Sequence, residues 1–122
     1  MSTKEITEGY LAGLQHLEES EWAFFLAQDM TFRTNGKGVY EGKEAYLQGT
    51  KRFFSRVIAV EVKDLLIDGD KACAVLQYEL QSSKGKRLTS EIAEMYTVAH
   101  GKIRSYAIYY DNTPYPAFMA QE

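Results

Sequence analysis

The side chains that could carry chemistry in this sequence are mostly phenols and carboxylates. Nine tyrosines stand beside two histidines and one cysteine in 122 residues. His16, His100 and Cys73 are too few to form a His/Cys zinc site. Neither histidine has an aspartate and a nucleophile in a recognisable arrangement, and no glycine-rich phosphate motif leads from a strand into a helix. The sequence therefore predicts no metal and no cofactor, and it limits chemistry to a carboxylic acid and phenols.

Glu94 is the acid with the most informative position. Alternation along its predicted strand puts it on one face with Ile92, Tyr96 and Val98. An acid with these neighbours either lies in a pocket or lies on a solvent-exposed face of the sheet, where it would pair with a lysine or arginine of the next strand. In a pocket, desolvation would raise its pKa, and the neutral acid could donate a hydrogen bond or move a proton. If the strand has the opposite parity, Glu91 takes this position.

Tyr10 is a second candidate, on the apolar stripe of the predicted first helix. It lies four residues from both Ile6 and Leu14. One interpretation is a half-buried tyrosine whose ring packs while its hydroxyl reaches water or a backbone carbonyl. The other is a phenol that points into a cavity as a hydrogen-bond donor. The spacing is compatible with both.

Three helices are predicted to position these groups. A Ser-Thr-Lys-Glu capping box at residues 2–5 begins the first helix. Ser20 is the predicted N-cap of a short second helix, which residues 22–26 fill with apolar side chains. Residues 41–44 open a third helix, in which Gly49 lowers the helix propensity.

Strands dominate the rest of the chain. Short strands are predicted at 29–34 and 39–41, and four long strands with period-two alternation follow, separated by turn residues, at 57–67, 71–81, 87–99 and 102–110. Three helices laid on a meander of antiparallel strands define an α+β domain. A single domain is expected over residues 1–122, with its core at about 5–112 and an extended tail at 112–122 that carries Pro114 and Pro116.

Charge and composition exclude several classes of partner. The formal net charge is −3 and no basic stretch is present, so nucleic acid is not expected as a partner. No apolar run approaches the roughly 20 residues that span a bilayer, and the first eight residues do not form a signal peptide. A single cysteine excludes an internal disulfide and is typical of the reducing cytoplasm, where we expect the protein to be.

Three segments resemble the SnoaL-like family. Residues 25–33 (FLAQDMTFR) are similar to its helix, acidic turn and first strand; residues 39–45 (VYEGKEA) to its short strand and next helix start; and residues 101–111 to its final hairpin and strand. The resemblance covers roughly residues 5–118. It implies a nuclear transport factor 2-like fold, in which helices pack on a curved, mixed but mainly antiparallel sheet to form a cone with an internal pocket. Fold alone does not define activity.

Two enzymes of that superfamily test what the resemblance implies about activity. When this sequence is aligned with ketosteroid isomerase, the tyrosine on the first helix of the isomerase corresponds to Tyr10, and its protonated acid in the sheet corresponds to Glu94. The aspartate with which the isomerase moves the proton corresponds to Thr34. Threonine lacks that basicity, so the same isomerisation is not expected. The arginine–aspartate pair of limonene epoxide hydrolase corresponds to Ala107 and Ile108 in this sequence. Because the acid of that pair is missing, epoxide hydrolase activity is not expected.

The predicted function is that of a SnoaL-like small-molecule-binding protein with a mostly apolar pocket. Its ligand would be a hydrophobic or aromatic molecule. The first alternative is an isomerase, cyclase or dehydratase-like enzyme, with Glu94 as acid/base and Tyr10 as oxyanion donor. The second is a non-enzymatic interaction module. A homodimer is expected through the outer sheet face, with Ile103 and Tyr109 on that face. The predicted pocket wall consists of Trp22, Phe25, Phe32, Thr34, Tyr78, Tyr96, Tyr106, Ile108 and Tyr110.

Overall fold

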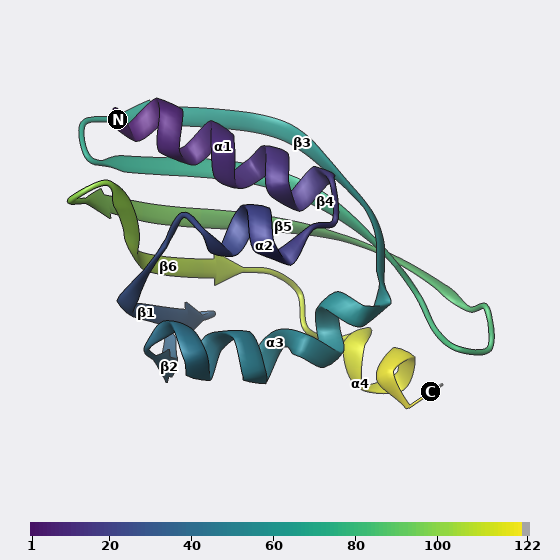
Figure 1. Cartoon of the computed structure of the whole chain (residues 1–122). Helices are drawn as coiled ribbons and strands as arrows, with labels where there is room; N and C mark the ends of the chain where they lie inside the picture. Colours follow the sequence, from purple (N-terminus) through teal and green to yellow (C-terminus); the bar gives the residue numbers. More distant parts are fainter. Residues whose placement is uncertain (121–122) are drawn as a thin grey trace.

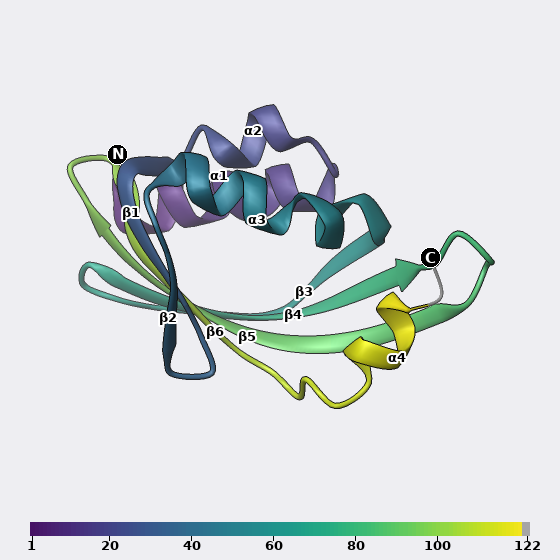
Figure 2. The same ribbon diagram turned by 90° about the horizontal axis from the view of Figure 1, so that it is seen from below.

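Six strands form one curved sheet, and the helices lie against its concave face (Figures 1 and 2). The computed structural model describes residues 1–120. The strand order is β2-β1-β6-β5-β4-β3; β1 and β6 run parallel, and every other neighbouring pair is antiparallel. The predicted fold class is therefore confirmed. The strands are β1 (Leu26–Thr34), β2 (Lys37–Glu41), β3 (Val57–Asp68), β4 (Lys71–Gln81), β5 (Arg87–Ala99) and β6 (Lys102–Tyr109).

The first helix begins as its sequence predicts. The helices are α1 (Thr3–Gln15), α2 (Glu19–Ala23), α3 (Lys43–Arg56) and α4 (Tyr115–Met119). At the start of α1 the Glu5 N–H donates to Ser2 Oγ (3.1 Å) and the Ser2 N–H donates to Glu5 Oε1 (2.9 Å), so the capping box is present. Helix α3 continues through Gly49 without a break. None of the helices within residues 1–120 is long and apolar enough to cross a membrane.

The inner face of the sheet follows the predicted alternation. In β4 the side chains of Ala74, Leu76, Tyr78 and Leu80 are buried, while the residues between them are partly exposed. β5 alternates in the same way and buries Glu94. Hydrophobic burial of this face against the helices is the main driving force that holds the two layers together.

The second helix differs from the prediction at both ends. Its N-cap is Glu18 rather than Ser20, and no side chain caps it. It ends at Ala23, so the residues that follow do not fill a helix. The Ile103 N–H donates to the Phe25 carbonyl at 2.7 Å, and this bond draws the chain onto β6. Strand β1 therefore begins at Leu26, three residues before the predicted position.

Ile103 is buried, and its predicted place on the outer face is wrong. The register between β5 and β6 shifts between Thr97 and Val98: Thr97 lies opposite Ser105, whereas Val98 lies opposite Ile103. The extra residue on β6 is Arg104, and a bulge of this kind reverses the alternation beyond it. Tyr109 does lie on the outer face as predicted, with 46% of its surface exposed.

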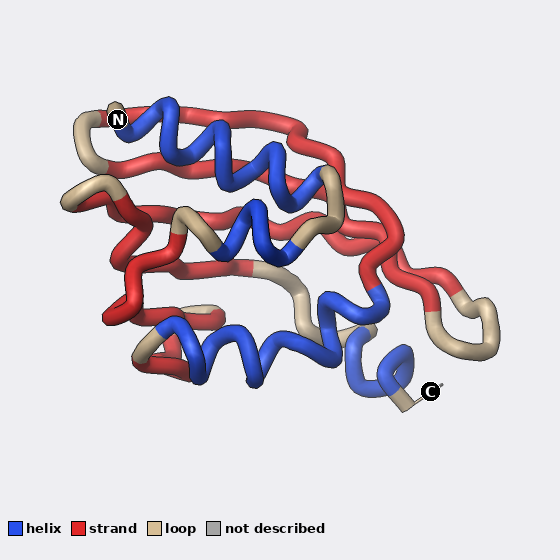
Figure 3. Tube along the Cα trace, in the orientation of Figure 1, coloured by secondary structure: helices blue, strands red, loops and turns tan. Residues whose placement is uncertain are grey.

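The tail is not extended over its whole length, as the prediction had it. Pro116 lies in the first turn of α4. Backbone N–H groups in the first turn have no hydrogen-bond partner within the helix, so proline is tolerated there. Phe118 is buried, and Arg52 of α3 donates to the Met119 carbonyl at 2.9 Å, so α4 lies beside the C-terminal part of α3 (Figures 1 and 3). The last two residues of the predicted tail, 121 and 122, lie outside the described part of the chain.

Candidate functional site

Glu94 points from the middle of β5 into the space between the sheet and the helices. On the sheet it lies opposite Ala74 of β4 and Ile108 of β6, and only 1% of its surface is exposed. Glu91 is exposed on the other face of β5. The predicted parity of this strand is therefore confirmed, and Glu94 is the acid inside the fold.

Three phenols surround the Glu94 carboxylate. Tyr78 of β4 donates to Oε2 at 2.5 Å, while Tyr96 of β5 and Tyr106 of β6 donate to Oε1 at 2.5 and 2.7 Å. Tyr10 of α1 stands behind them and donates to the Tyr106 hydroxyl at 2.7 Å. Hydrogen bonds to a charged acceptor are shorter and stronger than neutral ones, so this cluster holds the carboxylate in one orientation.

The electrostatics of the cluster follow from its burial. Burial raises the pKa of the Glu94 carboxyl above its ordinary value, and the hydrogen bonds from the three phenols oppose that shift without cancelling it. Burial, reinforced by the charge of Glu94, also raises the pKa of Tyr78, Tyr96 and Tyr106 well above the usual phenol range. The three phenols therefore remain protonated near neutral pH, and Glu94 is the member of the cluster that can gain or lose a proton.

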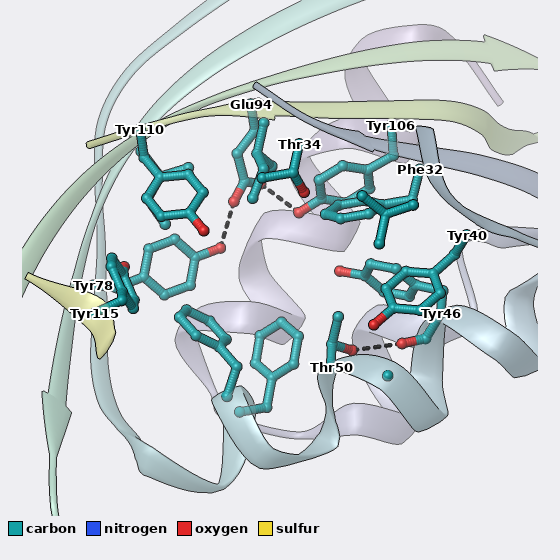
Figure 4. Close-up of a pocket in the computed structure, with 16 residues that line it drawn as sticks. Phe32, Thr34, Tyr40, Tyr46, Thr50, Tyr78, Glu94, Tyr106, Tyr110 and Tyr115 are labelled. Carbon is teal, nitrogen blue, oxygen red and sulfur yellow. Dashed lines mark hydrogen bonds between the residues drawn. The ribbon is translucent and has the colours of Figure 1, made fainter. Parts of the chain in front are cut away.

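A cavity of about 180 Å³ adjoins the cluster (Figure 4). It lies between α3, the β1–β2 hairpin and the inner faces of β4, β5 and β6. Glu94 is the only carboxylate in its wall, and no lysine, arginine or histidine of the described chain lines it. The aromatic side chains in the wall are Phe32, Tyr40, Tyr46, Phe53, Phe54, Tyr78, Tyr106, Tyr110 and Tyr115.

The structure brings most of the predicted pocket residues together at this cavity. Its wall contains Glu94 and the predicted residues Phe32, Thr34, Tyr78, Tyr106, Ile108 and Tyr110. Tyr10 and Tyr96 are not among the lining residues, although both belong to the hydrogen-bonded cluster. Tyr10 is fully buried and reaches Glu94 only through Tyr106.

Trp22 and Phe25 lie outside the cavity wall. The Trp22 ring packs against Phe54 of α3, with 4.7 Å between the ring centroids, and against the edge of Tyr10 at 6.3 Å. Phe25, in the turn between α2 and β1, packs against α1 at Gly9, where an added Cβ would come within 2.4 Å of its ring. Trp22 thus joins α2 to α1 and α3, Phe25 joins the turn to α1, and neither lines the cavity.

The predicted pocket wall leaves out the part that α3 and β2 contribute. Tyr46, Thr50, Phe53 and Phe54 recur at the spacing that puts side chains on one side of a helix, and this spacing was the available signal. The contribution of Tyr40 had no such signal. Its ring crosses α3 at Gly49, where an added Cβ would come within 2.4 Å of three ring and hydroxyl atoms.

The arrangement offers a buried acid, several phenol hydroxyls and an apolar aromatic surface. Within residues 1–120 no group of histidine, cysteine, aspartate and glutamate side chains could hold a metal ion. The residues present can supply hydrogen bonding, aromatic stacking and proton transfer through Glu94.

Comparison with known proteins identifies the family. The family model described as a SnoaL-like domain matches residues 7–106. This match covers most of the chain, and the chain therefore belongs to the SnoaL-like family. A search among curated proteins found no match.

Solved structures agree on the fold. A candidate SnoaL-like polyketide cyclase from Mesorhizobium loti has a TM-score of 0.76 and 24% identity, and the alignment covers 90% of this chain and 100% of that one. A second candidate cyclase, from a Jannaschia species, has a TM-score of 0.82 and 11% identity, with 98% and 92% covered. A nuclear transport factor 2-like protein from Burkholderia thailandensis has a TM-score of 0.82 and 15% identity, with 98% of each chain covered. At these identities the likeness establishes the fold alone.

Proposed function

We propose that the protein binds a small hydrophobic or aromatic molecule in the cavity beside Glu94. The observation that carries this proposal is the composition of the wall, where aromatic rings surround a single hydrogen-bonded carboxylate. Ligand sites are typically apolar and aromatic, with a few placed polar groups that fix orientation.

The size of the cavity limits the size of the ligand. Apolar cavities of about 150 Å³ admit benzene, and this cavity has about 180 Å³. A one-ring molecule with a short substituent fits this volume, whereas a fused multi-ring molecule requires the wall to open. Because few atoms are buried, we expect affinities in the range of roughly micromolar to millimolar.

A cavity-filling variant tests this proposal. Ile108→Phe adds bulk inside the wall, whereas Ile67→Phe makes the same substitution at an exposed position of β3 that is not part of the wall. One-ring aromatic compounds are expected to raise the melting temperature of the wild type and of Ile67→Phe, because they bind only the folded state. They should have little effect on Ile108→Phe. Equal stabilisation of all three proteins would contradict binding in this cavity.

A second candidate function is proton transfer on a molecule bound there. The specific observation is that the Glu94 carboxyl faces the cavity and has a raised pKa, as general acids and bases in enzymes often do. Tyr106 donates its one hydrogen to Glu94 and so orients the carboxylate, and Tyr10, the predicted oxyanion donor, reaches the site only through Tyr106. Glu94→Gln should abolish turnover of an identified substrate while its binding persists, and unchanged turnover in this variant excludes the role.

We also propose a homodimer formed through the outer face of the sheet, in the cytoplasm. No helix within residues 1–120 covers that face (Figure 2), and Met95 and Tyr109 are exposed there. A charge at buried Ile103 would disturb the core, so Tyr109→Glu is the better probe. It should give monomers in light scattering, and a persistent dimer excludes this interface.

A further inference from the structure

We propose that the cavity takes a small organic cation, an amine whose ammonium group lies against Glu94 and the surrounding rings. The inference rests on the proposed function, because it assumes that a small molecule occupies the cavity. It adds the charge of that molecule, which neither the fold nor the family defines.

The first support is the unused acceptor capacity of Glu94. An ionised carboxylate has about four lone-pair sites, two on each oxygen. Within the described chain, Oε1 accepts from Tyr96 and Tyr106, whereas Oε2 accepts only from Tyr78. One site on Oε2 therefore remains for a donor from the cavity, and an ammonium group is a strong donor to a carboxylate.

The second support is the absence of a counter-charge. A buried carboxylate is costly unless it is paired, and in this cluster it has phenol dipoles but no cation. No lysine, arginine or histidine among residues 1–120 lines the cavity. A ligand cation would provide the missing charge. An anionic ligand would face Glu94 with nothing to offset the repulsion.

The third support is the aromatic wall. Electron-rich ring faces attract cations, and proteins that bind ammonium ligands commonly enclose them in aromatic side chains. The cavity wall contains aromatic rings from three parts of the chain: Tyr40 of β2, Tyr46 and Phe53 of α3, and Tyr110 just after β6. Figure 4 shows the rings of Tyr40, Tyr46 and Tyr110 in the same wall as Glu94. Ring faces and carboxylate together would compensate the loss of water around an ammonium group.

Probes of nearly equal size separate charge from shape. Benzylamine is a cation at neutral pH, benzyl alcohol is a neutral donor, ethylbenzene is neutral without a donor, and benzoate is an anion. Their affinities for the purified full chain can be measured by isothermal titration calorimetry. We expect benzylamine to bind at least about tenfold more tightly than either neutral probe, since one cation–π or ionic contact is of that size.

Two variants assign the preference to a residue. Glu94→Gln should reduce the affinity for benzylamine to that for benzyl alcohol. Glu91→Gln is the matched control on the exposed face of the same strand, and it should keep the preference. A cation preference that survives Glu94→Gln overturns the inference.

The pH dependence gives a second test that needs no variant. The titratable groups that face Glu94 are Tyr78 on β4, Tyr96 on β5, Tyr106 on β6, through Tyr106 also Tyr10 on α1, and across the cavity Tyr46 on α3, whose pKa is raised by burial and by the charge of Glu94. All five are phenols that stay neutral near pH 7, so Glu94 alone changes charge. Benzylamine should bind more weakly as the pH falls and Glu94 takes up a proton, whereas the affinity for ethylbenzene should stay constant. A constant benzylamine affinity overturns the inference.

The outcomes also separate this inference from the function on which it rests. If neutral probes bind as tightly as benzylamine, or if benzoate binds best, the inference is wrong and the proposed small-molecule binding stands. If no probe binds and none raises the melting temperature, the proposed function fails as well.

Discussion

The hydroxyl of Tyr10 on α1 donates a hydrogen bond of 2.7 Å to the hydroxyl of Tyr106 on β6. The two residues are 96 positions apart in the sequence, and Tyr106 in turn donates to Glu94. The first helix is thus joined to the carboxylate in the sheet by a chain of two phenols. Buried polar networks of this kind specify one packing of a core when every member is satisfied.

Tyr10→Phe removes one end of this chain without changing the packed volume of the ring. We expect the free energy of unfolding to fall by about 1 kcal/mol, the usual size of a lost hydrogen bond. Urea denaturation measures the change. Tyr109→Phe is the control, because its hydroxyl lies on the exposed outer face. Equal stability of Tyr10→Phe and the wild type would show that the bond contributes nothing.

The raised pKa of Glu94 predicts how stability depends on pH. An unfolded glutamate has its ordinary pKa of 4.5, and burial raises the folded-state pKa above it. Between the two values the folded state binds more protons than the unfolded state. The contribution of this group to the free energy of unfolding is therefore complete below the ordinary pKa and is lost as the pH rises through the folded-state pKa.

Glu94→Gln isolates this contribution, because glutamine does not titrate. The other carboxylates affect both proteins alike and cancel in the comparison. Denaturation at a series of pH values should show the wild type losing stability relative to Glu94→Gln as the pH rises above 4.5. A difference that stays flat, or that changes in the opposite direction, contradicts the raised pKa.

Gly49→Ala should destabilise the protein, contrary to the usual effect of alanine inside a helix. The added Cβ would lie 2.0 Å from the Tyr40 hydroxyl oxygen, so the Tyr40 ring must move. Overpacking of this kind costs typically about 1–3 kcal/mol, more than the gain in helix propensity. Chemical denaturation of Gly49→Ala measures the loss. The control is Gly38→Ala, where an added Cβ meets nothing within 4 Å.

The double variant Gly49→Ala/Tyr40→Ala tests the cause. With the ring removed, the alanine at 49 has room, and the two substitutions should not be additive. Additive losses would mean that Gly49 is needed for another reason.

Phe118→Ala should release α4 from the rest of the fold. Phe118 is buried, and its truncation removes apolar contact worth up to about 3–5 kcal/mol in a core that cannot relax. A five-residue helix at the chain end can instead detach locally. We expect faster amide hydrogen exchange at residues 115–120 and unchanged exchange in β4 and β5. Ala117→Ser, at an exposed position of the same helix, should leave exchange unaltered. Protection that persists in Phe118→Ala contradicts this docking.

Sequence patterns predicted the sheet well because its strands follow simple rules. Alternation in β4 and β5 assigned Tyr78 and Glu94 to the inner face, and the capping box located the start of α1. Ile103 was misplaced because a bulge at one residue leaves no mark in a local pattern. Two prolines concealed α4, since proline fits both an extended tail and a first helical turn.

The site was predictable only in part, for a related reason. Glu94 stood out because an acid among apolar residues is unusual wherever it occurs. Tyr10 and Trp22 were expected at the cavity because their helical face points inward, but an inward side chain can end in the core as readily as in the wall. Tyr40 joins the wall across a glycine on another element. A contact of that kind depends on tertiary packing, which periodicity does not describe.

The parallel pairing of β1 with β6 has a consequence for synthesis on the ribosome. The end of β1 at Thr34 precedes the start of β6 at Lys102 by 68 residues. At about 5–20 residues per second, β1 waits roughly 3–14 seconds for its partner. During that interval the β1–β2 hairpin has no sheet to join, and the cavity lacks the wall formed by Tyr106 and Ile108. The cavity therefore comes into existence only when nearly the whole chain has been made, and a nascent chain stopped before β6 should bind none of the one-ring probes.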